Sequence, residues 1–191
     1  MTEKELMNIE TFSIPVRENV SLRFIRPDEA EALYTLVDTN RAYLRKWLDW
    51  VDAQTGPDVS RKNILKRIED AKAGTAFDLG IFLKGELIGS MGFNSIWRKS
   101  RRGEVGYWLS ENQEGQGIMT DCVRAIVSCG FKELKLHRIE IHCSTNNHKS
   151  FAIPERLGFT LDGILRDGSF LYDHFESSKV YSMLESEWNT A

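Results

Sequence analysis

The chain has 191 residues, which is enough for one well-buried domain, and we expect residues 1–191 to form a single domain. Hydrophobic residues make up 41% of the chain and charged residues 28%, as in ordinary globular proteins. The net charge of -3 gives no general attraction to nucleic acid, which favours strongly basic surfaces, so we expect no nucleic-acid partner.

The cysteines and histidines argue against a disulfide framework or a structural metal. The three cysteines are odd in number and lack CxxC spacing, and the four histidines do not cluster in the sequence. Residues 1–10 lack the basic and apolar regions of a signal peptide, and no apolar run is long enough to span a membrane. We therefore expect a cytoplasmic protein with no metal ion and no membrane partner.

The first part of the chain combines strand and helix patterns. Residues 22–26 have the pattern of a strand, and a helix is predicted to follow from Pro27. Apolar residues at helical spacing predict a second helix over 43–51 and a third helix that ends at Gly74.

A hairpin pattern comes next. Apolar residues alternate strictly over 77–83, and a turn at Lys84-Gly85 leads to a partner strand over 87–93. The basic run over 98–102 has two interpretations. It is either a solvent-exposed hairpin loop or a handle for an acidic substrate or a coenzyme phosphate.

The segment 114–120, Glu-Gly-Gln-Gly-Ile-Met-Thr, connects a strand to an amphipathic helix. Residues 104–109 before it have a period of two, and the residues after it recur at helical spacing, namely Ile118, Cys122, Ile126, Val127, Phe131 and Leu134. Glycines here let the backbone turn tightly and direct unpaired N–H groups toward one point, where phosphate binds. The motif alone also fits a tight connection without a ligand.

Two other glycine motifs do not fit the segment. A Walker loop would need Gly-Lys-Ser/Thr after a longer glycine spacing, and a dinucleotide fingerprint would need a third glycine where this chain has Met119 or Thr120. After the helix, a strand over 138–143, a short helix, and strands near 159–165 and 179–184 complete the chain. Strand, glycine turn, helix and strand predict a parallel crossover inside an otherwise antiparallel sheet.

Four segments occur in one order: 22–28, 44–52, the glycine segment, and Asn147-His148-Lys149-Ser150 leading to 155–159. In this order they resemble the GNAT superfamily of acetyl-CoA-dependent N-acetyltransferases, and within it the RimJ/RimL type that acetylates ribosomal proteins. The resemblance implies an α/β (α+β) chain with the GNAT fold. This fold has a mixed, mostly antiparallel central sheet with a parallel, splayed strand pair and flanking helices.

The resemblance implies acetyl-CoA as the co-substrate. The pyrophosphate is then bound by backbone amides of Gly115, Gln116, Gly117, Ile118, Met119 and Thr120. The pantetheine arm is expected between the splayed strands, paired with main-chain groups of Tyr107, Trp108 and Leu109, and Asn147 resembles the residue that bonds it. Glu114 departs from the family pattern, and we expect its side chain to face away from the phosphates.

Attack of an amine on a thioester needs a base for the amine proton, a stabilised carbonyl oxygen and a proton for the thiolate. Glu104, with apolar Val105 and Trp108 nearby, is the first candidate base, and the alternative for it is a solvent-facing strand carboxylate. Asp167 is the second candidate, because RimL-type enzymes use an acid in that late segment. The aligned position in this chain is Ser169.

The thiolate needs a proton donor. Many GNAT members use a tyrosine where this chain has Pro154, and the resemblance to the RimJ/RimL type implies Ser150 in that role. Ser150 could also cap the helix that follows it, in place of that role or together with it. We expect Pro154 in the first turn of that helix or at a bend. Cys143 has two interpretations, core packing or a place beside the coenzyme thiol.

The acceptor side rests on Tyr43, Trp47 and Trp50, which partly share one face of the predicted helix over 43–51 and resemble the family's acceptor-gripping region. Core packing is the alternative for each of them. We expect acetyl transfer to the N-terminal amine of a protein or peptide, such as a ribosomal protein. The alternatives are a small-molecule amine as acceptor or a non-catalytic acyl-CoA-binding module, and a homodimer is left open.

Overall fold

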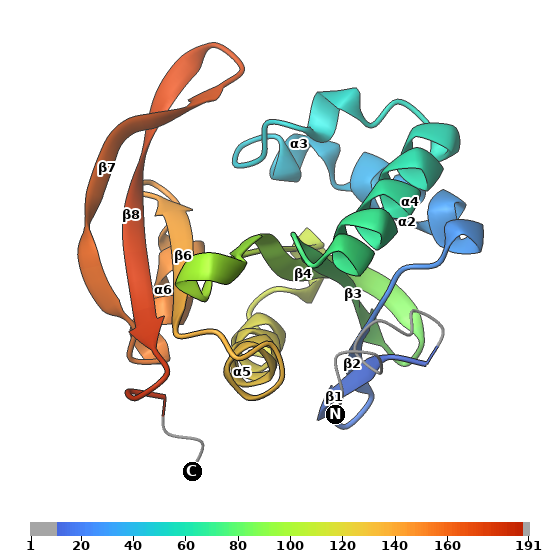
Figure 1. Ribbon diagram of the computed structural model, residues 1–191. Helices are drawn as coiled ribbons and strands as arrows, with labels where there is room; N and C mark the ends of the chain where they lie inside the picture. The colour runs from blue at the N-terminus through green and yellow to red at the C-terminus, as the bar shows by residue number, and fades with distance from the viewer. Residues whose placement is uncertain (1–10, 189–191) are drawn as a thin grey trace.

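The computed structural model describes residues 11–188, which form a mixed sheet of eight strands with helices on both faces (Figure 1). The strands are β1 (Ser13–Arg17), β2 (Val20–Arg23), β3 (Phe77–Leu83), β4 (Glu86–Trp97), β5 (Arg102–Leu109), β6 (Arg138–Ser144), β7 (Thr160–Leu171) and β8 (His174–Leu184). The helices are α2 (Ala30–Thr39), α3 (Arg41–Leu44), α4 (Pro57–Ala73), α5 (Ile118–Lys132) and α6 (His148–Arg156).

The strand order across the sheet is β1-β2-β3-β4-β5-β6-β8-β7. Of the neighbouring pairs within residues 11–188, β5 and β6 alone run parallel, and α5 connects them. A parallel pair needs such a crossover, whereas the hairpins on either side need only short turns. The predicted parallel crossover in a mostly antiparallel sheet is confirmed.

Two apolar layers hold the sheet between the helices. Phe77, Leu79 and Ile81 of β3 belong to the main core, together with the apolar face of α5. Phe82 of the same strand packs instead with Ile64 and Ile68 of α4 on the opposite face. Figure 1 shows α2 and α4 on one side of β3 and β4 and α5 on the other. The sheet therefore carries a separate apolar layer on each face.

The prediction of one helix over 43–51 is wrong, because α3 is a single turn and the chain then continues through turns. The Arg41 guanidinium accounts for the break. It donates hydrogen bonds to the carbonyls of Val51 at 2.7 Å and Gln54 at 2.6 Å, which fixes this segment as a loop around the side chain. Leu44 and Val51 are buried in the same small apolar cluster.

The basic run over 98–102 lies at the turn between β4 and β5, at the end of β5 opposite the glycine segment. Arg101 donates to the carbonyl of Lys135 at 2.6 Å, and the guanidinium of Arg102 lies 3.9 Å from the centre of the Trp97 ring. These contacts fit the hairpin-loop interpretation. A coenzyme phosphate on the glycine segment would lie a full strand length away.

No helix among residues 11–188 is long and apolar enough to cross a membrane. In the same part of the chain, no group of three or more His, Cys, Asp or Glu side chains is placed to hold a metal ion. The signal-peptide prediction concerns residues 1–10, which lie outside the described residues.

Candidate active site

The parallel strands β5 and β6 separate before they end. Their pairing runs from Arg102 and Arg138 to Val105 and Ile141 and stops there, although both strands continue. On its other edge, β5 stays paired with β4 as far as Leu109. The strands therefore open into a V, in which the β6-facing main-chain groups of the end of β5 are left for another extended chain. Tyr107, Trp108 and Leu109 lie on this open edge.

The glycine segment follows at the wide end of the V. Gly115 and Gly117 have φ values of 74° and 75°, in the left-handed region that favours glycine, and Gly117 is the residue before α5. The first amides of a helix have no acceptor within it, so those of Ile118, Met119 and Thr120 are free to bind an anion. Their side chains are buried beneath them. The segment has the backbone of an anion site.

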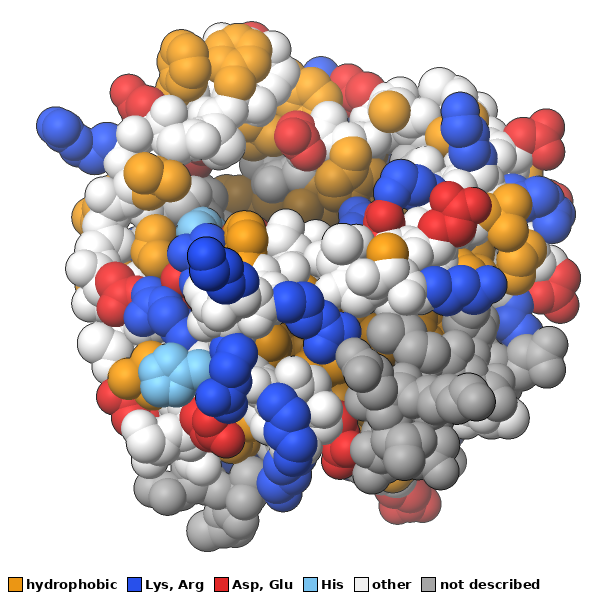
Figure 2. Space-filling model, in the orientation of Figure 1, with side chains coloured by type: hydrophobic (Ala, Val, Ile, Leu, Met, Phe, Trp, Pro, Cys, Tyr) orange, Lys and Arg blue, Asp and Glu red, His pale blue; other side chains and the backbone are white. Residues whose placement is uncertain are grey.

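Two arginines brace this segment from other elements. Arg17 of β1 donates to the carbonyl of Gln116 and to the carboxylate of Asp121, both at 3.1 Å. Arg156 of α6 donates to the Thr120 hydroxyl at 2.7 Å, which leaves the hydroxyl hydrogen to donate elsewhere. Figure 2 shows Lys and Arg side chains gathered in the middle of this face of the molecule, in the region where Figure 1 draws α5. The local surface is basic although the chain as a whole is acidic.

The Glu114 carboxylate is engaged by two side chains from other elements. Its carboxylate accepts hydrogen bonds from the Tyr43 hydroxyl and from the Lys149 ammonium group, the latter at 2.6 Å. Burial raises the pKa of the Tyr43 hydroxyl above its usual value, and the bond to Glu114 raises it further. The structure thus places Tyr43 beside the glycine segment, as a link between α3 and α6.

Ser150, Cys143 and Tyr107 meet inside the V. The Ser150 hydroxyl lies 3.2 Å from the Cys143 sulfur and 3.4 Å from the Tyr107 oxygen. Burial raises the pKa of both the Tyr107 hydroxyl and the Cys143 thiol, so all three groups are protonated at neutral pH. The alternative of Ser150 as a helix cap is wrong, because Asn147 occupies that position and accepts from the Ser150 amide at 3.1 Å.

Pro154 helps to place this cluster. It lies inside α6, beyond the predicted first turn, and has no N–H to donate to the carbonyl four residues earlier, which is that of Ser150. The Tyr107 hydroxyl donates to that carbonyl instead, at 3.0 Å. The proline therefore leaves an acceptor in the helix that ties the side chain of Tyr107 to α6.

We expect Tyr107→Phe to lower the free energy of unfolding by about 1–3 kcal/mol, the usual cost of a buried polar group that loses its partner. Restoring a backbone donor with Pro154→Ala in the same chain should recover part of this loss, since the new N–H can reach the Ser150 carbonyl. Urea unfolding of the two single variants and the double variant measures the coupling. Equal losses for Tyr107→Phe with and without Pro154 would contradict this account.

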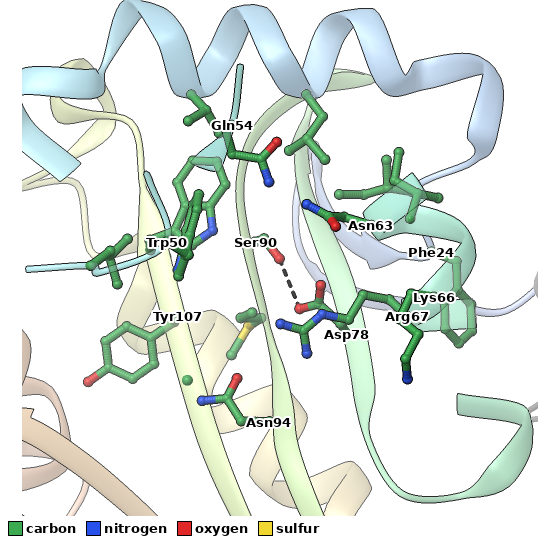
Figure 3. Close-up of a pocket in the computed structure, with 18 of the residues that line it drawn as sticks. Phe24, Trp50, Gln54, Asn63, Lys66, Arg67, Asp78, Ser90, Asn94 and Tyr107 are labelled. Carbon is green, nitrogen blue, oxygen red and sulfur yellow. Dashed lines mark hydrogen bonds between the residues drawn. The ribbon is translucent and has the colours of Figure 1, made fainter. Parts of the chain in front are cut away.

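A cavity of about 390 Å³ lies between the sheet and the helices α2 and α4, on the face of the sheet opposite α5 (Figure 3). It reaches β5 at Gly106, Tyr107 and Trp108, so it meets the V from the side. Trp50 lines it, with its ring centre 6.0 Å from that of Trp108. Trp47 and Tyr43 do not line it.

The candidate bases occupy different places. Glu104 is half-buried on β5 and pairs with Glu140 of β6, one position before the V opens at Val105. It shares a face of β5 with Gly106, which lines the cavity, because side chains alternate along a strand. Asp167 is exposed on β7, and its carboxylate accepts from the Ser177 hydroxyl at 3.3 Å. Of the two acids, Glu104 is the one beside both the V and the cavity.

The comparison with known families agrees with this geometry. The sequence model of the Acetyltransferase (GNAT) domain matches residues 19–160. The chain belongs to the GNAT acetyltransferase family. The predicted fold class and the prediction of an N-acetyltransferase are thereby confirmed.

Its relatives within the GNAT family include the ribosomal-protein-serine acetyltransferase of Escherichia coli (strain K12), 30% identical over 91% of this chain and 97% of that protein. The structure of RimL, a ribosomal L7/L12 alpha-N-protein acetyltransferase, in complex with coenzyme A matches with a TM-score of 0.88 and 30% identity, over 91% of this chain and 98% of that one. The microcin C7 self immunity acetyltransferase MccE, in complex with acetyl-CoA and AMP, matches with a TM-score of 0.84 and 28% identity, over 88% and 94%.

Sequence reasoning missed the polar floor of the GNAT chain's cavity, formed by Asp78, Ser90 and Asn94. The signal that could have found it is Asp78 itself, a carboxylate in the otherwise apolar strand over 77–83. The two other residues became neighbours of Asp78 only through strand pairing.

Proposed function

We propose that the chain transfers the acetyl group of acetyl-CoA to the N-terminal amine of a protein, such as a ribosomal protein. The observation that carries the proposal is the meeting of the V and the cavity at Tyr107 and its neighbours on β5. The V between β5 and β6 suits the coenzyme arm, and the cavity suits the acceptor. The E. coli and RimL relatives, whose names record acetylation of ribosomal proteins, support the choice of acceptor.

The residues present fit acetyl-CoA. The left-handed glycines Gly115 and Gly117 aim the first amides of α5 at one point for the pyrophosphate, and the unpaired edge from Tyr107 to Leu109 suits the pantetheine amides. Asn147 uses its side-chain oxygen as the α6 cap, which leaves its amide nitrogen for the same arm. The coenzyme supplies an acetyl group activated as a thioester.

In this proposal Glu104 takes a proton from the incoming ammonium group, directly or through a water molecule, so that the nitrogen lone pair can form the new bond to carbon. As the carbon–sulfur bond breaks, Ser150 donates its hydroxyl proton to the departing sulfur and takes a proton back from solvent, while Glu104 releases to solvent the proton that it took. The cluster with Tyr107 and Cys143 holds the Ser150 hydroxyl inside the V. RimL has been captured with coenzyme A in a disulfide to a cysteine, and Cys143 lies where a coenzyme thiol would come close to Ser150.

We expect a peptide that begins with Ser or Ala to be acetylated at its terminal amine, and an internal lysine of an N-terminally blocked peptide to be a poor acceptor. The amine must lose its proton before it attacks, so the rate should rise toward the α-amino pKa of about 8, well below the lysine value of about 10.4. Mass spectrometry of the products, with initial rates from pH 6 to 9, tests both statements. Transfer to the lysine alone would rule out the N-terminal acceptor.

A small amine is the second candidate acceptor, because MccE is similar to this chain and its structure holds AMP with acetyl-CoA. A panel of aminoacyl amides, diamines and aminoacyl nucleotides, tested beside the peptides, separates the two. Turnover confined to small amines would replace the peptide proposal.

A further inference from the structure

Asp78, on the floor of the cavity, begins a row of three residues that crosses three strands. Asp78 of β3 pairs with Gly92 of β4, and Gly92 pairs with Gly106 of β5. Two strand spacings separate the ends of the row by about 10 Å. Gly92 carries no side chain, so no side chain of the row stands between the Asp78 carboxylate and β5.

Asp78 is half-buried and has one acceptor oxygen to spare. Its Oδ1 accepts from the Ser90 hydroxyl at 3.0 Å, while Oδ2 has no hydrogen-bond donor among residues 11–188. Figure 3 shows the Arg67 guanidinium turned toward this carboxylate from α4. Burial raises the pKa of Asp78, and the Arg67 charge opposes that rise. An acceptor and a donor thus face the cavity side by side.

A bulge in β4 adds another polar group. Phe93 pairs with Val105 and Ser95 pairs with Glu104, so Asn94 is an extra residue in the strand. Bulges near active sites often redirect a side chain. Here the side chain of Asn94 lies over Gly106, where an added Cβ would come within 2.4 Å of the Asn94 amide nitrogen. The bulge extends the polar floor to β5.

We propose that Asp78 and Arg67 bind a peptide group of the acceptor, two to three residues beyond the amine that is acetylated. Asp78 accepts from the peptide N–H, and Arg67 donates to the carbonyl. The proposal rests on the proposed function and names its acceptor class, an extended polypeptide N-terminus. An extended chain covers about 3.5 Å per residue, so the distance of about 10 Å from β5 corresponds to the third residue.

The charges of the cavity favour a neutral peptide group over a second cation. A diamine ammonium would meet Asp78 but also the positive charge of Arg67, which lies on the same side of the cavity. The other polar groups on the lining include the amides of Gln54, Asn63 and Asn94, which both donate and accept. Such a set complements amide groups.

The test measures how catalysis depends on acceptor length. The full chain and its variants are assayed with acetyl-CoA and with serinamide, seryl-alaninamide and seryl-alanyl-alaninamide, and the released thiol is followed. For the unsubstituted chain, kcat/KM should rise from the one-residue to the three-residue acceptor. In Asp78→Asn, the kcat/KM of the three-residue acceptor divided by that of the one-residue acceptor should fall about 10- to 100-fold. The variant loses a hydrogen bond to a charged group, and the new amide N–H at this position faces the peptide N–H, so two donors oppose each other.

Two further variants complete the test. Glu69→Gln removes an exposed carboxylate from α4 and should leave the ratio unchanged. Arg67→Met, on the open side of α4, should also lower the ratio. The acetyl-CoA affinity of each variant reports whether it is folded. If Asp78→Asn does not fold, Arg67→Met provides the test. An unchanged ratio in folded Asp78→Asn overturns the proposal. The variants are also assayed with the diamine 1,8-diaminooctane as acceptor. A loss of kcat/KM confined to this diamine likewise overturns the proposal, because the site would then bind a second cation.

The failure of this inference can be told from failure of the proposed function. If the unsubstituted chain acetylates no peptide at its terminal amine but does acetylate small amines, the peptide function fails, and Asp78 loses its proposed role with it. If peptides are acetylated and only the response of the variants is absent, the function stands and the role of Asp78 falls.

Discussion

Replacing Gly117 by valine is expected to weaken acetyl-CoA binding by about 100-fold or more while the chain stays folded. At a φ of 75° an L-residue costs about 1–2 kcal/mol, and a β-branched side chain costs more. The backbone can relieve this strain by rotating, which turns the amides of the first turn of α5 away from one another. Losing two hydrogen bonds to a charged phosphate, at about 1.5–3 kcal/mol each, gives the expected factor. Isothermal calorimetry measures it directly.

The matched control is Gly163→Val in β7. A Cβ at Gly163 meets no atom within 4 Å, and its φ lies outside the left-handed region, so the same substitution should leave the affinity unchanged. At Gly117 the space is also open, with only the Arg17 side chain 4.0 Å away, so the expected effect is one of backbone conformation rather than of a clash. A folded Gly117→Val variant with normal affinity would remove the segment from the coenzyme site.

The glycine segment could be predicted because its signals are local. The alternation over 104–109, the two glycines and the helical spacing after Ile118 all lie within one stretch of sequence, and β5 and α5 form there. The parallel pairing followed from the need for a crossover between strands joined by a helix. The hairpin over 77–93 was equally local, and it forms β3 and β4.

The segment over 43–51 could not be predicted from its own residues. Its apolar spacing is that of a helix, but Arg41 binds carbonyl groups from a later part of the chain and fixes a loop. The same cause sends its aromatic residues to different places. Trp50 lines the cavity, whereas Tyr43 bonds to Glu114 beside the glycine segment. A shared helix face had suggested a shared role for them.

The cavity floor depends on strand register, which the sequence does not state. Asp78 is brought level with Gly92 and Gly106 by two separate antiparallel pairings, and the bulge at Asn94 shifts the second pairing by one residue beyond Phe93. A shift of one residue turns every later side chain to the other face. Without the bulge, Glu104 would pair with Asn94 rather than with Ser95.

Glu104→Gln is expected to lower kcat by about 100-fold or more with little change in acetyl-CoA affinity. Removal of a general base typically lowers the rate by about 10²- to 10⁴-fold. Glu104 stands beside the point where β5 and β6 separate and shares its strand face with Gly106 of the cavity. A group there can take a proton from an amine that enters from the cavity. Glutamine keeps the size of the side chain and cannot accept that proton. Steady-state rates across pH, together with calorimetry of acetyl-CoA binding, measure both quantities.

Asp167→Asn is the matched control, since it makes the same chemical change at the other candidate acid. Asp167 is exposed on β7 and engaged with Ser177, so its loss should leave kcat and the pH profile close to those of the unsubstituted chain. The two variants together test whether Glu104 or Asp167 takes the proton of the amine. If Asp167→Asn abolishes turnover while Glu104→Gln keeps both the rate and its pH dependence, the base acts from the β7–β8 hairpin and the assignment to β5 is wrong.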